Sequence, residues 1–343
     1  MISIPGYQIT KKLSESNNSV VYRGVRDNDR KAVVLKVLNE DHPSPLRIAR
    51  FQQAYETIRL LKFDGIVQAY GLETIQAQWV IVLEDFGGVA LNQARIIRHL
   101  NLETFLPLAI KITNIIAQIH QQQIIHKDIT PANILINPQT QQVKLIDFDI
   151  ATVLSREQPA FRNPSLLEGT LAYIAPEQTG RMNRAIDYRT DFYSLGATFY
   201  EMLTGQPPFQ ATDPLTLIHH HLAIPPQPPH LLNPEIPSVL SQIIVKLLAK
   251  NAEDRYQSTD GLVADLQACL QQWQKQGRVE WFLIGQKDIS DTFQLPQKLY
   301  GRKQALENLL TTFAHITHKG VASETEKKGR FKQTELILVT GQA

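Results

Sequence analysis

IIHKDITPANILIN, at residues 124–137, would form one continuous apolar segment but for five side chains. These are His126, Lys127, Asp128, Thr130 and Asn133. Burying a carboxylate, a cation and an amide without partners costs several kcal/mol or shifts their pKa values. The segment is therefore either a short loop between two buried elements or a site where charge is required. The surrounding sequence decides between these two interpretations.

The composition is that of an ordinary globular protein. The chain has 343 residues, enough for about two domains, with 43% hydrophobic and 20% charged residues. A formal net charge of +2 gives no reason to expect a nucleic acid or an anionic membrane as a partner. The single cysteine, Cys269, excludes an internal disulfide and fits a reducing compartment. Without a secretory signal or a long apolar run, the sequence predicts a cytoplasmic protein with no membrane span.

Residues 7–90 are rich in short β-branched segments separated by polar turns, a pattern typical of strands. Five strands are expected, at 7–13, 19–25, 31–38, 66–72 and 79–86. One helix is expected among them at about 45–61, because apolar residues recur from Ile48 to Leu61 at three- and four-residue spacing.

From about residue 101 the apolar pattern becomes helical, with Asn101 as a plausible N-cap. Pro107 is expected to bend the first of these helices or to delay its start. Further helices are expected at 189–204, 213–222, 236–249 and 259–274. A β-rich part followed by a helical part predicts an α+β fold of two lobes.

Oxygen-bearing side chains cluster around the opening segment. Asp128 and Asn133 share the expected loop, and the next strand, in VKLIDFDIA, ends at Asp147. Carboxylate and amide oxygens suit Mg²⁺, and phosphate oxygens would complete the coordination. Asp128 could then accept a hydroxyl proton. Lys36 interrupts the apolar strand VVLKVL and requires an anionic partner, for which phosphate is one candidate.

Six patterns occur in one order along the chain. They are Lys36, HKDITPAN, DFD at 147–149, GTLAYIAPE at 169–177, DFYSLG at 191–196 and Arg255 in AEDRYQ. Each is weak alone, but six in order are specific. Over about residues 7–272 the chain resembles a eukaryotic-type (Hanks-type) serine/threonine protein kinase domain. APEQTGRMNR and LIDFDIATVLSRE more narrowly resemble the N-terminal kinase domain of large bacterial multi-sensor signal-transduction kinases.

The resemblance implies a bilobal protein-kinase fold of the α+β class. The kinase domain would cover 1–275, with a small β-rich N-lobe at about 1–88 and a larger helical C-lobe at about 89–275. A weakly periodic linker would follow at 276–300.

Residues 301–343 then predict a helix and a strand, which resemble the entry of an AAA-like ATPase module. Gly341 would be the first glycine of that module's phosphate-binding loop, and the sequence stops before the rest of the loop. An ordinary helix and strand is the alternative.

The same resemblance assigns site residues, with ATP and Mg²⁺ as cofactors. Asp128 would position and deprotonate the acceptor hydroxyl, and Lys36 would contact the α- and β-phosphates. Asn133 and Asp147 would hold Mg²⁺. Leu83 would line the back of the adenine pocket, and the Glu84–Phe86 backbone would bond the adenine edge. The full set of further ATP-binding residues is Leu13, Ser14, Ser16, Ser19, Val21, Leu83, Glu84 and Phe86.

Three residues would have structural roles. Glu177 would pair with Arg255 to support the helical lobe, and Asp191 would brace the loop that carries the catalytic base.

Other residues belong to the expected activation segment, which holds Ser155, Ser165 and Thr170. Thr170 would face the acceptor residue, and Lys127 could pair with a phosphate on the segment. The partners implied are a protein substrate with serine or threonine acceptors and the ATPase and sensor domains of the same polypeptide.

Three serines stand where the family has the glycines of G-x-G-x-x-G: Ser14, Ser16 and Ser19 in LSESNNSVVY. Glycine lets backbone amides approach phosphate and tolerates positive φ. A serine forced into the left-handed region costs about 1–2 kcal/mol. Weaker or altered ATP binding is therefore expected.

Three further positions depart from the family. Ala54 replaces the helix glutamate that should orient Lys36, and Glu56 lies on a different side of the helix. Thr130 replaces a lysine that would contact the γ-phosphate. Asp149 replaces the glycine of the metal motif, which would stiffen the loop or add a carboxylate near the metal.

Alternative interpretations remain open. One is a pseudokinase that acts as a nucleotide-binding regulatory module for downstream ATPase and sensor domains. A small-molecule phosphotransferase, which shares the H-x-D-x-x-x-x-N loop, is another, although GTLAYIAPE argues for a polypeptide groove. Residue by residue, the loop oxygens could be caps and Lys36 could extend from an edge strand to water. Consecutive histidines at 219–221 would point in different directions on a helix, which argues against zinc.

Overall fold

The computed structural model describes residues 4–16, 18–39, 43–93, 101–153, 169–182 and 184–289. The chain divides into two compact units, Met1–Gln294 and Leu295–Ala343. The second unit lies outside the described residues, and with it the helix, strand and ATPase entry expected at 301–343. Ser155 and Ser165 also lie outside them.

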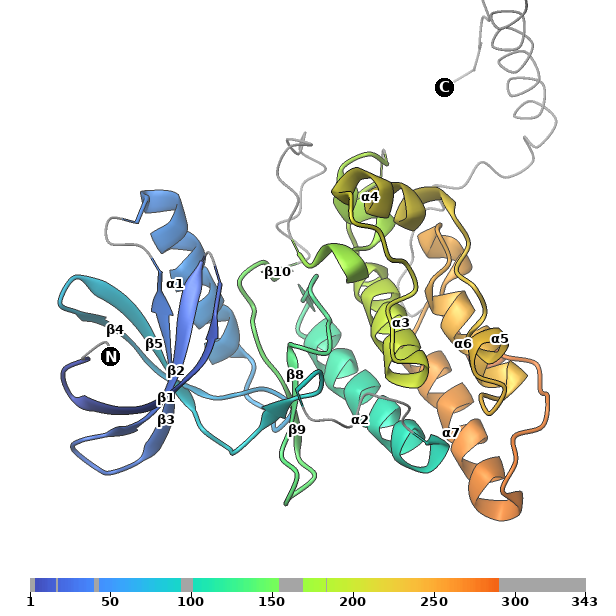
Figure 1. Ribbon diagram of the computed structural model, residues 1–343, viewed down its shortest axis with the longest axis horizontal. Coiled ribbons are helices and arrows are strands. Elements are labelled where there is room, and N and C mark those ends of the chain that lie inside the picture. Colours follow the sequence, from blue (N-terminus) through green and yellow to red (C-terminus); the bar gives the residue numbers. More distant parts are fainter. Residues whose placement is uncertain are drawn as a thin grey trace, which may run out of the picture. The chain divides into compact units, whose positions relative to one another are not determined.

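The N-terminal part of the first unit is an antiparallel sheet with the strand order β1-β2-β3-β5-β4. A single helix, α1, is inserted between the third and fourth strands and lies beside the sheet (Figure 1). Their bounds are β1 Tyr7–Glu15, β2 Ser19–Arg26, β3 Ala32–Leu38, α1 Pro45–Leu60, β4 Ala69–Ile75 and β5 Gln78–Glu84. The five expected strands and the helix are thus present, with the fourth strand beginning three residues later than the sequence indicated.

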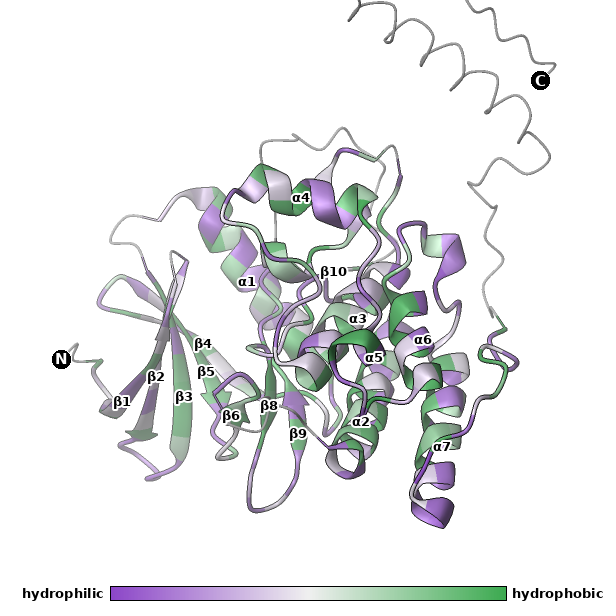
Figure 2. Cartoon of the chain, turned by 45° about the vertical axis from the view of Figure 1, so that its right-hand side comes forward, coloured by the Kyte–Doolittle hydropathy of each residue, from purple (hydrophilic) through white to green (hydrophobic). Residues whose placement is uncertain are grey.

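Strand β3 separates two apolar clusters and is hydrophobic over most of its length (Figure 2). Val33, Leu35 and Val37 face one side, in a small cluster with residues of β2 and β5. Since side chains alternate along a strand, Lys36 points to the other side, which also carries Leu38 of the main core. The alternation therefore aims the one lysine of this strand at the rest of the fold.

The C-terminal part is mainly helical, as Figure 1 shows, and gives the first unit its expected two-lobed α+β fold. Its helices are α2 Leu102–Gln121, α3 Arg189–Thr204, α4 Pro214–Ala223, α5 Pro229–Leu232, α6 Ser238–Leu247 and α7 Thr259–Gln276. Short 3₁₀ helices are η2 Leu171–Tyr173, η3 Pro176–Thr179 and η4 Ala252–Asp254.

Two small sheets lie where this helical lobe meets the segment after β5. One has the order β6-β8-β9, and the other pairs β10 with β7. The strands are β6 Val89–Ala90, β7 Ile124–Ile125, β8 Ile134–Ile136, β9 Val143–Leu145 and β10 Thr152–Val153. Strands β7 and β8 lie within the segment 124–137 on either side of its polar residues, so residues 126–133 form a loop between two buried strands.

Helix α2 begins at Leu102, so the later start considered because of Pro107 was wrong. Pro107 lies in the second turn, where its missing N–H removes a single backbone bond close to the exposed helix end. The predicted cap is present, because Asn101 Oδ1 accepts a hydrogen bond from the Thr104 amide at 3.0 Å. Among the described residues, α2 is also the one helix long and apolar enough to cross a membrane, but its apolar residues belong to the main core.

Changing Asn101 to alanine is expected to lower the free energy of unfolding by about 1 kcal/mol, because the Thr104 amide loses its acceptor. Chemical denaturation would measure this. Asn101→Ser, which keeps a capping oxygen, should restore most of the loss. Asn114→Ala, on the exposed side of the same helix, is the matched control. An equal effect at both positions would contradict the capping role.

The first half of the expected linker packs against the helical lobe. Helix α7 ends at Gln276, and Val279, Phe282 and Ile284 then lie against the core. Asp288 Oδ1 accepts hydrogen bonds from the backbone amides of Gln257 and Ser258 at 2.8 and 2.9 Å. Residues 277–289 are therefore integrated with this lobe.

Candidate functional site

Lys36 meets two carboxylates that lie far away in the sequence. Its Nζ donates to Asp147 Oδ1 at 2.7 Å and to Asp149 Oδ1 at 2.6 Å. Burial alone would lower the pKa of Lys36, but the two carboxylates raise it above its usual value. Burial would raise the pKa of Asp147, yet the Lys36 ammonium holds it below its ordinary range. Burial and the adjacent Asp147 charge raise the pKa of Asp149 despite Lys36.

Asp128 and Asn133 are joined within the loop after β7. Asn133 Nδ2 donates to both the carbonyl oxygen and Oδ2 of Asp128, each at 2.9 Å. The other carboxylate oxygen, Oδ1, accepts from the Thr170 amide at 2.9 Å. The Asp128 carboxylate is thus fixed from two sides, and Thr170 lies directly beside it.

His126 links this loop to the segment that carries Asp147. Its Nε2 lies 3.0 Å from the Ile146 carbonyl oxygen, and its Nδ1 accepts from the Asp128 amide at 3.2 Å. The imidazole is fully buried, and its ring meets the edge of Phe148 at 4.7 Å between centroids. These partners require a proton on Nε2 and a lone pair on Nδ1. His126 is one of the five polar residues within 124–137, but nothing in the sequence indicated this connecting role.

Asp191, on α3, holds the backbone of the same loop. Its carboxylate accepts from the amides of His126 at 2.9 Å and Lys127 at 2.7 Å, and it contacts His120 Nε2 at 2.8 Å. Burial would raise the pKa of Asp191, but these hydrogen bonds, that from His120 first, lower it. The bracing role expected of Asp191 agrees with these contacts.

Lys127 and Asp147 both have left-handed backbones, with φ of 69° and 68°. For a residue other than glycine this conformation costs about 1–2 kcal/mol, less for Asp than for Lys. The Lys127 backbone is held there from both sides, since its amide donates to Asp191 and its carbonyl accepts from Gln178 Nε2 at 2.9 Å. The residue is buried, at 4% exposure. Strain concentrated in this way is common at functional sites.

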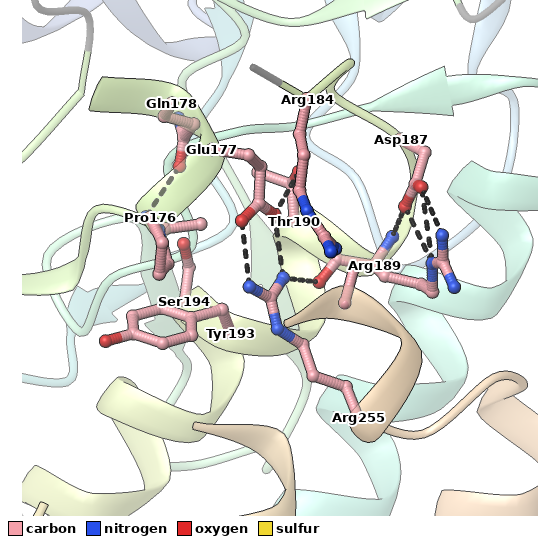
Figure 3. A network of polar contacts seen from close by, with 12 residues as sticks. Pro176, Glu177, Gln178, Arg184, Asp187, Arg189, Thr190, Tyr193, Ser194 and Arg255 are labelled. Atoms are coloured by element: carbon pink, nitrogen blue, oxygen red, sulfur yellow. Dashed lines mark hydrogen bonds and ion pairs between the residues drawn. The ribbon is translucent and has the colours of Figure 1, made fainter. Parts of the chain in front are cut away.

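The predicted pair of Glu177 with Arg255 is present and buried (Figure 3). Two parallel hydrogen bonds of 2.7 and 2.8 Å join the guanidinium to the carboxylate. Thr190 Oγ1 donates to the same carboxylate, and Arg255 also donates to the carbonyl oxygens of Ala249 and Arg189. Burial would raise the pKa of Glu177, but Arg255 lowers it below the ordinary value. The pair ties η3, which follows Thr170, to the segment before α7.

The β1–β2 turn carries the three serines that replace glycines. None of Ser14, Ser16 and Ser19 has a positive φ, so the left-handed strain considered for serine is not present. Ser16 Oγ accepts from the amides of Asn18 at 3.2 Å and Ser19 at 3.0 Å, and donates to the Ser19 carbonyl at 3.1 Å. The Ser16 hydroxyl is therefore used within the turn itself.

Three of the positions expected to surround adenine, Leu83, Glu84 and Phe86, lie at or just after the end of β5. Leu83 is buried in the main core. The Glu84 amide donates to the Gln68 carbonyl at 2.9 Å, and the Glu84 carboxylate pairs with Lys144 of β9. The Phe86 carbonyl accepts from Asn137 Nδ2 at 2.5 Å. Leu13 and Val21 are half-buried on β1 and β2. The pairs involving Lys144 and Asn137 were not anticipated, because a lone lysine or asparagine near a strand gives no sequence signal.

The residues that depart from the family pattern also have defined positions in the fold. Ala54 is buried on α1, while Glu56 is exposed and pairs with Arg59. Thr130 is buried within the loop. Helix α1 thus offers Lys36 no carboxylate at either position.

Oxygen-bearing side chains of the described residues are the candidates for metal binding at this site. Within the described ranges, no group of three or more His, Cys, Asp or Glu side chains could hold a metal ion. His221 is buried against the Tyr193 hydroxyl at 3.0 Å, and burial lowers its pKa to about 3. The Asp147 carboxylate and the Asn133 amide offer hard oxygens of the type that Mg²⁺ prefers. These residues fit a magnesium ion whose remaining ligands come from a phosphate or from water.

The comparisons with known proteins agree with this geometry. The family model for the protein kinase domain matches residues 7–266. A probable serine/threonine-protein kinase of Streptomyces coelicolor is 29% identical over 77% of the chain and 40% of its own length. The serine/threonine-protein kinase PknB of Mycobacterium tuberculosis is 34% identical over 68% of the chain and 38% of its own length.

A third relative is the hybrid signal transduction histidine kinase G of Dictyostelium discoideum. It is 29% identical over 64% of the chain and 9% of its own length. The chain therefore spans 40% or less of the length of these curated relatives.

Proposed function

Because this chain belongs to the protein kinase family, we propose that it transfers the γ-phosphoryl group of Mg-ATP to serine or threonine hydroxyls of a protein. The observation that carries the proposal is the meeting of Lys36 with Asp147 at 2.7 Å, beside the loop that fixes Asp128. The relatives' descriptions as serine/threonine kinases support the acceptor class.

The chain's own residues would act by positioning and electrostatics. Lys36 would bind the α- and β-phosphates. Asp128, held by Asn133 and the Thr170 amide, would orient the acceptor hydroxyl and take its proton. Asp147 and the amide oxygen of Asn133 would hold Mg²⁺, which when bound offsets the charge of the phosphates.

The other ATP contacts would come from β1, β2, β5 and the segment that follows β5. Leu13, Val21 and Leu83 would enclose the adenine, and the backbone at Glu84–Phe86 would bond its edge. The Phe86 carbonyl already accepts from Asn137, so that edge would rely on the remaining backbone groups. The β1–β2 turn, with Ser14, Ser16 and Ser19, would cover the phosphates, and Ser16 would stabilise the turn rather than donate to phosphate.

The activation segment and the helical lobe would handle the protein substrate. Thr170 lies beside Asp128 and would face the acceptor residue. Lys127 would pair with a phosphate on the same segment. The ion pair of Glu177 with Arg255 would fix the position of the end of the activation segment on the helical lobe.

For the whole polypeptide, we propose a cytoplasmic signalling protein in which ATPase and sensor domains follow the kinase domain at 1–275. Residues 276–300 would connect them, with the part at 277–289 packed on the helical lobe, and 301–343 would begin the ATPase module. The match to 9% of a hybrid signal transduction histidine kinase supports a kinase domain within a longer signalling polypeptide.

Binding of Mg-ATP is expected to raise the melting temperature, and Lys36→Met to abolish most of that rise. A ligand at about one hundred times its Kd adds about 2.7 kcal/mol to stability, which corresponds to several degrees. Differential scanning fluorimetry would measure the shift. Lys31→Met changes an exposed lysine just before β3, and this control should keep the full shift. A full shift in the Lys36 variant would contradict the assigned phosphate contact.

A further inference from the structure

Lys36 is held by two carboxylates from one short segment, and by none from α1. Both Asp147 and Asp149 lie within 2.7 Å of its Nζ, and the lysine side chain is 10% exposed. On α1, Ala54 carries no carboxylate and Glu56 is engaged with Arg59. Among the described residues, the counter-charge of this buried ammonium therefore comes from the segment 147–149.

Asp147 and Asp149 are expected to have different roles once a metal ion is bound. Asp147 is the residue assigned to Mg²⁺, and a carboxylate that turns toward a divalent ion gives up part of its bond to an ammonium. A lysine has a flexible four-carbon stem and needs a fixed partner to keep its ammonium in one place. A buried ammonium that loses its partner also carries a large desolvation cost.

We infer that Asp149 is the positioning residue that keeps Lys36 directed at the nucleotide phosphates while Asp147 binds the metal. The inference rests on the proposed function. It explains why a carboxylate stands where the resembled family has glycine while the helix glutamate is absent. One loop would then set both the metal carboxylate and the lysine, so that neither depends on a carboxylate from α1.

Two other roles for Asp149 make different predictions. As a metal ligand, it would raise the affinity for Mg²⁺, and its loss would be overcome at high Mg²⁺ concentration. As a competitor of the phosphates for Lys36, it would weaken nucleotide binding, and its loss would tighten binding.

The test is the affinity for ADP at saturating Mg²⁺, measured by displacement of a fluorescent nucleotide. Asp149→Asn should weaken ADP binding about 10- to 100-fold, the effect of a lost charge-assisted hydrogen bond. Asp149→Glu, which keeps a carboxylate, should recover most of the affinity. In a Lys36→Met background, Asp149→Asn should cause no further loss, because the two residues act as one unit. Asp29→Asn, on an exposed turn of the sheet, is the matched control.

The inference is overturned if the Asp149→Asn loss adds fully to that of Lys36→Met, if it is seen only below saturating Mg²⁺, or if it reverses into tighter binding. It is also overturned if Asp149→Asn and Asp29→Asn behave alike. Melting curves of each variant identify any that fail to fold, and Asp149→Gly then gives a second variant without the carboxylate. If the unmodified protein binds no nucleotide, the proposed function fails, which is a separate result from any of these.

Discussion

Changing Asp128 to asparagine is expected to slow phosphoryl transfer to protein by about 10²–10⁴-fold. Asparagine is close to aspartate in shape and still offers one oxygen, so the bond with the Thr170 amide or with Asn133 can be kept. It cannot take a proton from the acceptor hydroxyl. The loss should therefore fall on kcat, with ADP affinity and melting temperature close to those of the unmodified protein. Transfer of radioactive phosphate from ATP to a general protein acceptor would measure it.

Asp187→Asn is the matched control for this experiment. Asp187 pairs with Arg189, away from Asp128, and should leave transfer within a few-fold of normal. Equal transfer by the unmodified protein and Asp128→Asn would remove the assigned role. Nucleotide binding with no transfer in the unmodified protein would favour a regulatory nucleotide-binding module. Phosphate found on a small molecule and never on protein would favour a small-molecule phosphotransferase.

Changing Arg255 to alanine is expected to lower the free energy of unfolding by about 3–5 kcal/mol. The reason is that Glu177 is left buried with its charge uncompensated. Three carbonyl oxygens, of Ala249, Lys250 and Arg189, lose a donor at the same time. Denaturant titration would measure the change. Arg278→Ala, which breaks an exposed pair with Glu280, should change stability by less than about 1 kcal/mol.

The pH dependence provides a second check on the same pair. The folded-state pKa of Glu177 is lowered, so its contribution to stability is present above the ordinary value of 4.5 and is lost as the pH falls further. The stability difference between the unmodified protein and Arg255→Ala should therefore shrink in acid. A difference that stays constant from pH 7 to pH 3 would contradict the paired state of Glu177.

The sequence predicted the longer helices well because their boundaries have local causes, whereas the short α5 was not predicted. The expected helix at 189–204 has the bounds of α3, and Asn101 caps α2 as expected. The pair of Glu177 with Arg255 could be expected from the order of the motifs. Each of these predictions depends on the neighbouring residues or on a recurring family pattern.

The side-chain partners that the sequence did not predict depend on the path of the backbone. Asp147 has a left-handed φ of 68°, and this turn helps to bring Asp149 to Lys36. The hydrogen bonds that engage Ser16 depend on the geometry of one turn. Lys144 pairs with Glu84 because β9 lies beside the end of β5. Apolar periodicity indicates which side of a strand is buried, but it does not indicate which polar groups will meet there.

The carboxylate of Asp191 has a consequence for how the protein is made on the ribosome. It is the acceptor for the amides of His126 and Lys127, which precede it by more than sixty positions in the chain. Before α3 has been synthesised, those two amides lack their native acceptor, and the left-handed backbone of Lys127 lacks one of the two contacts that hold it. The loop around Asp128 can therefore reach its final form only after α3 has emerged. A nascent chain that stops earlier should not acquire a working site.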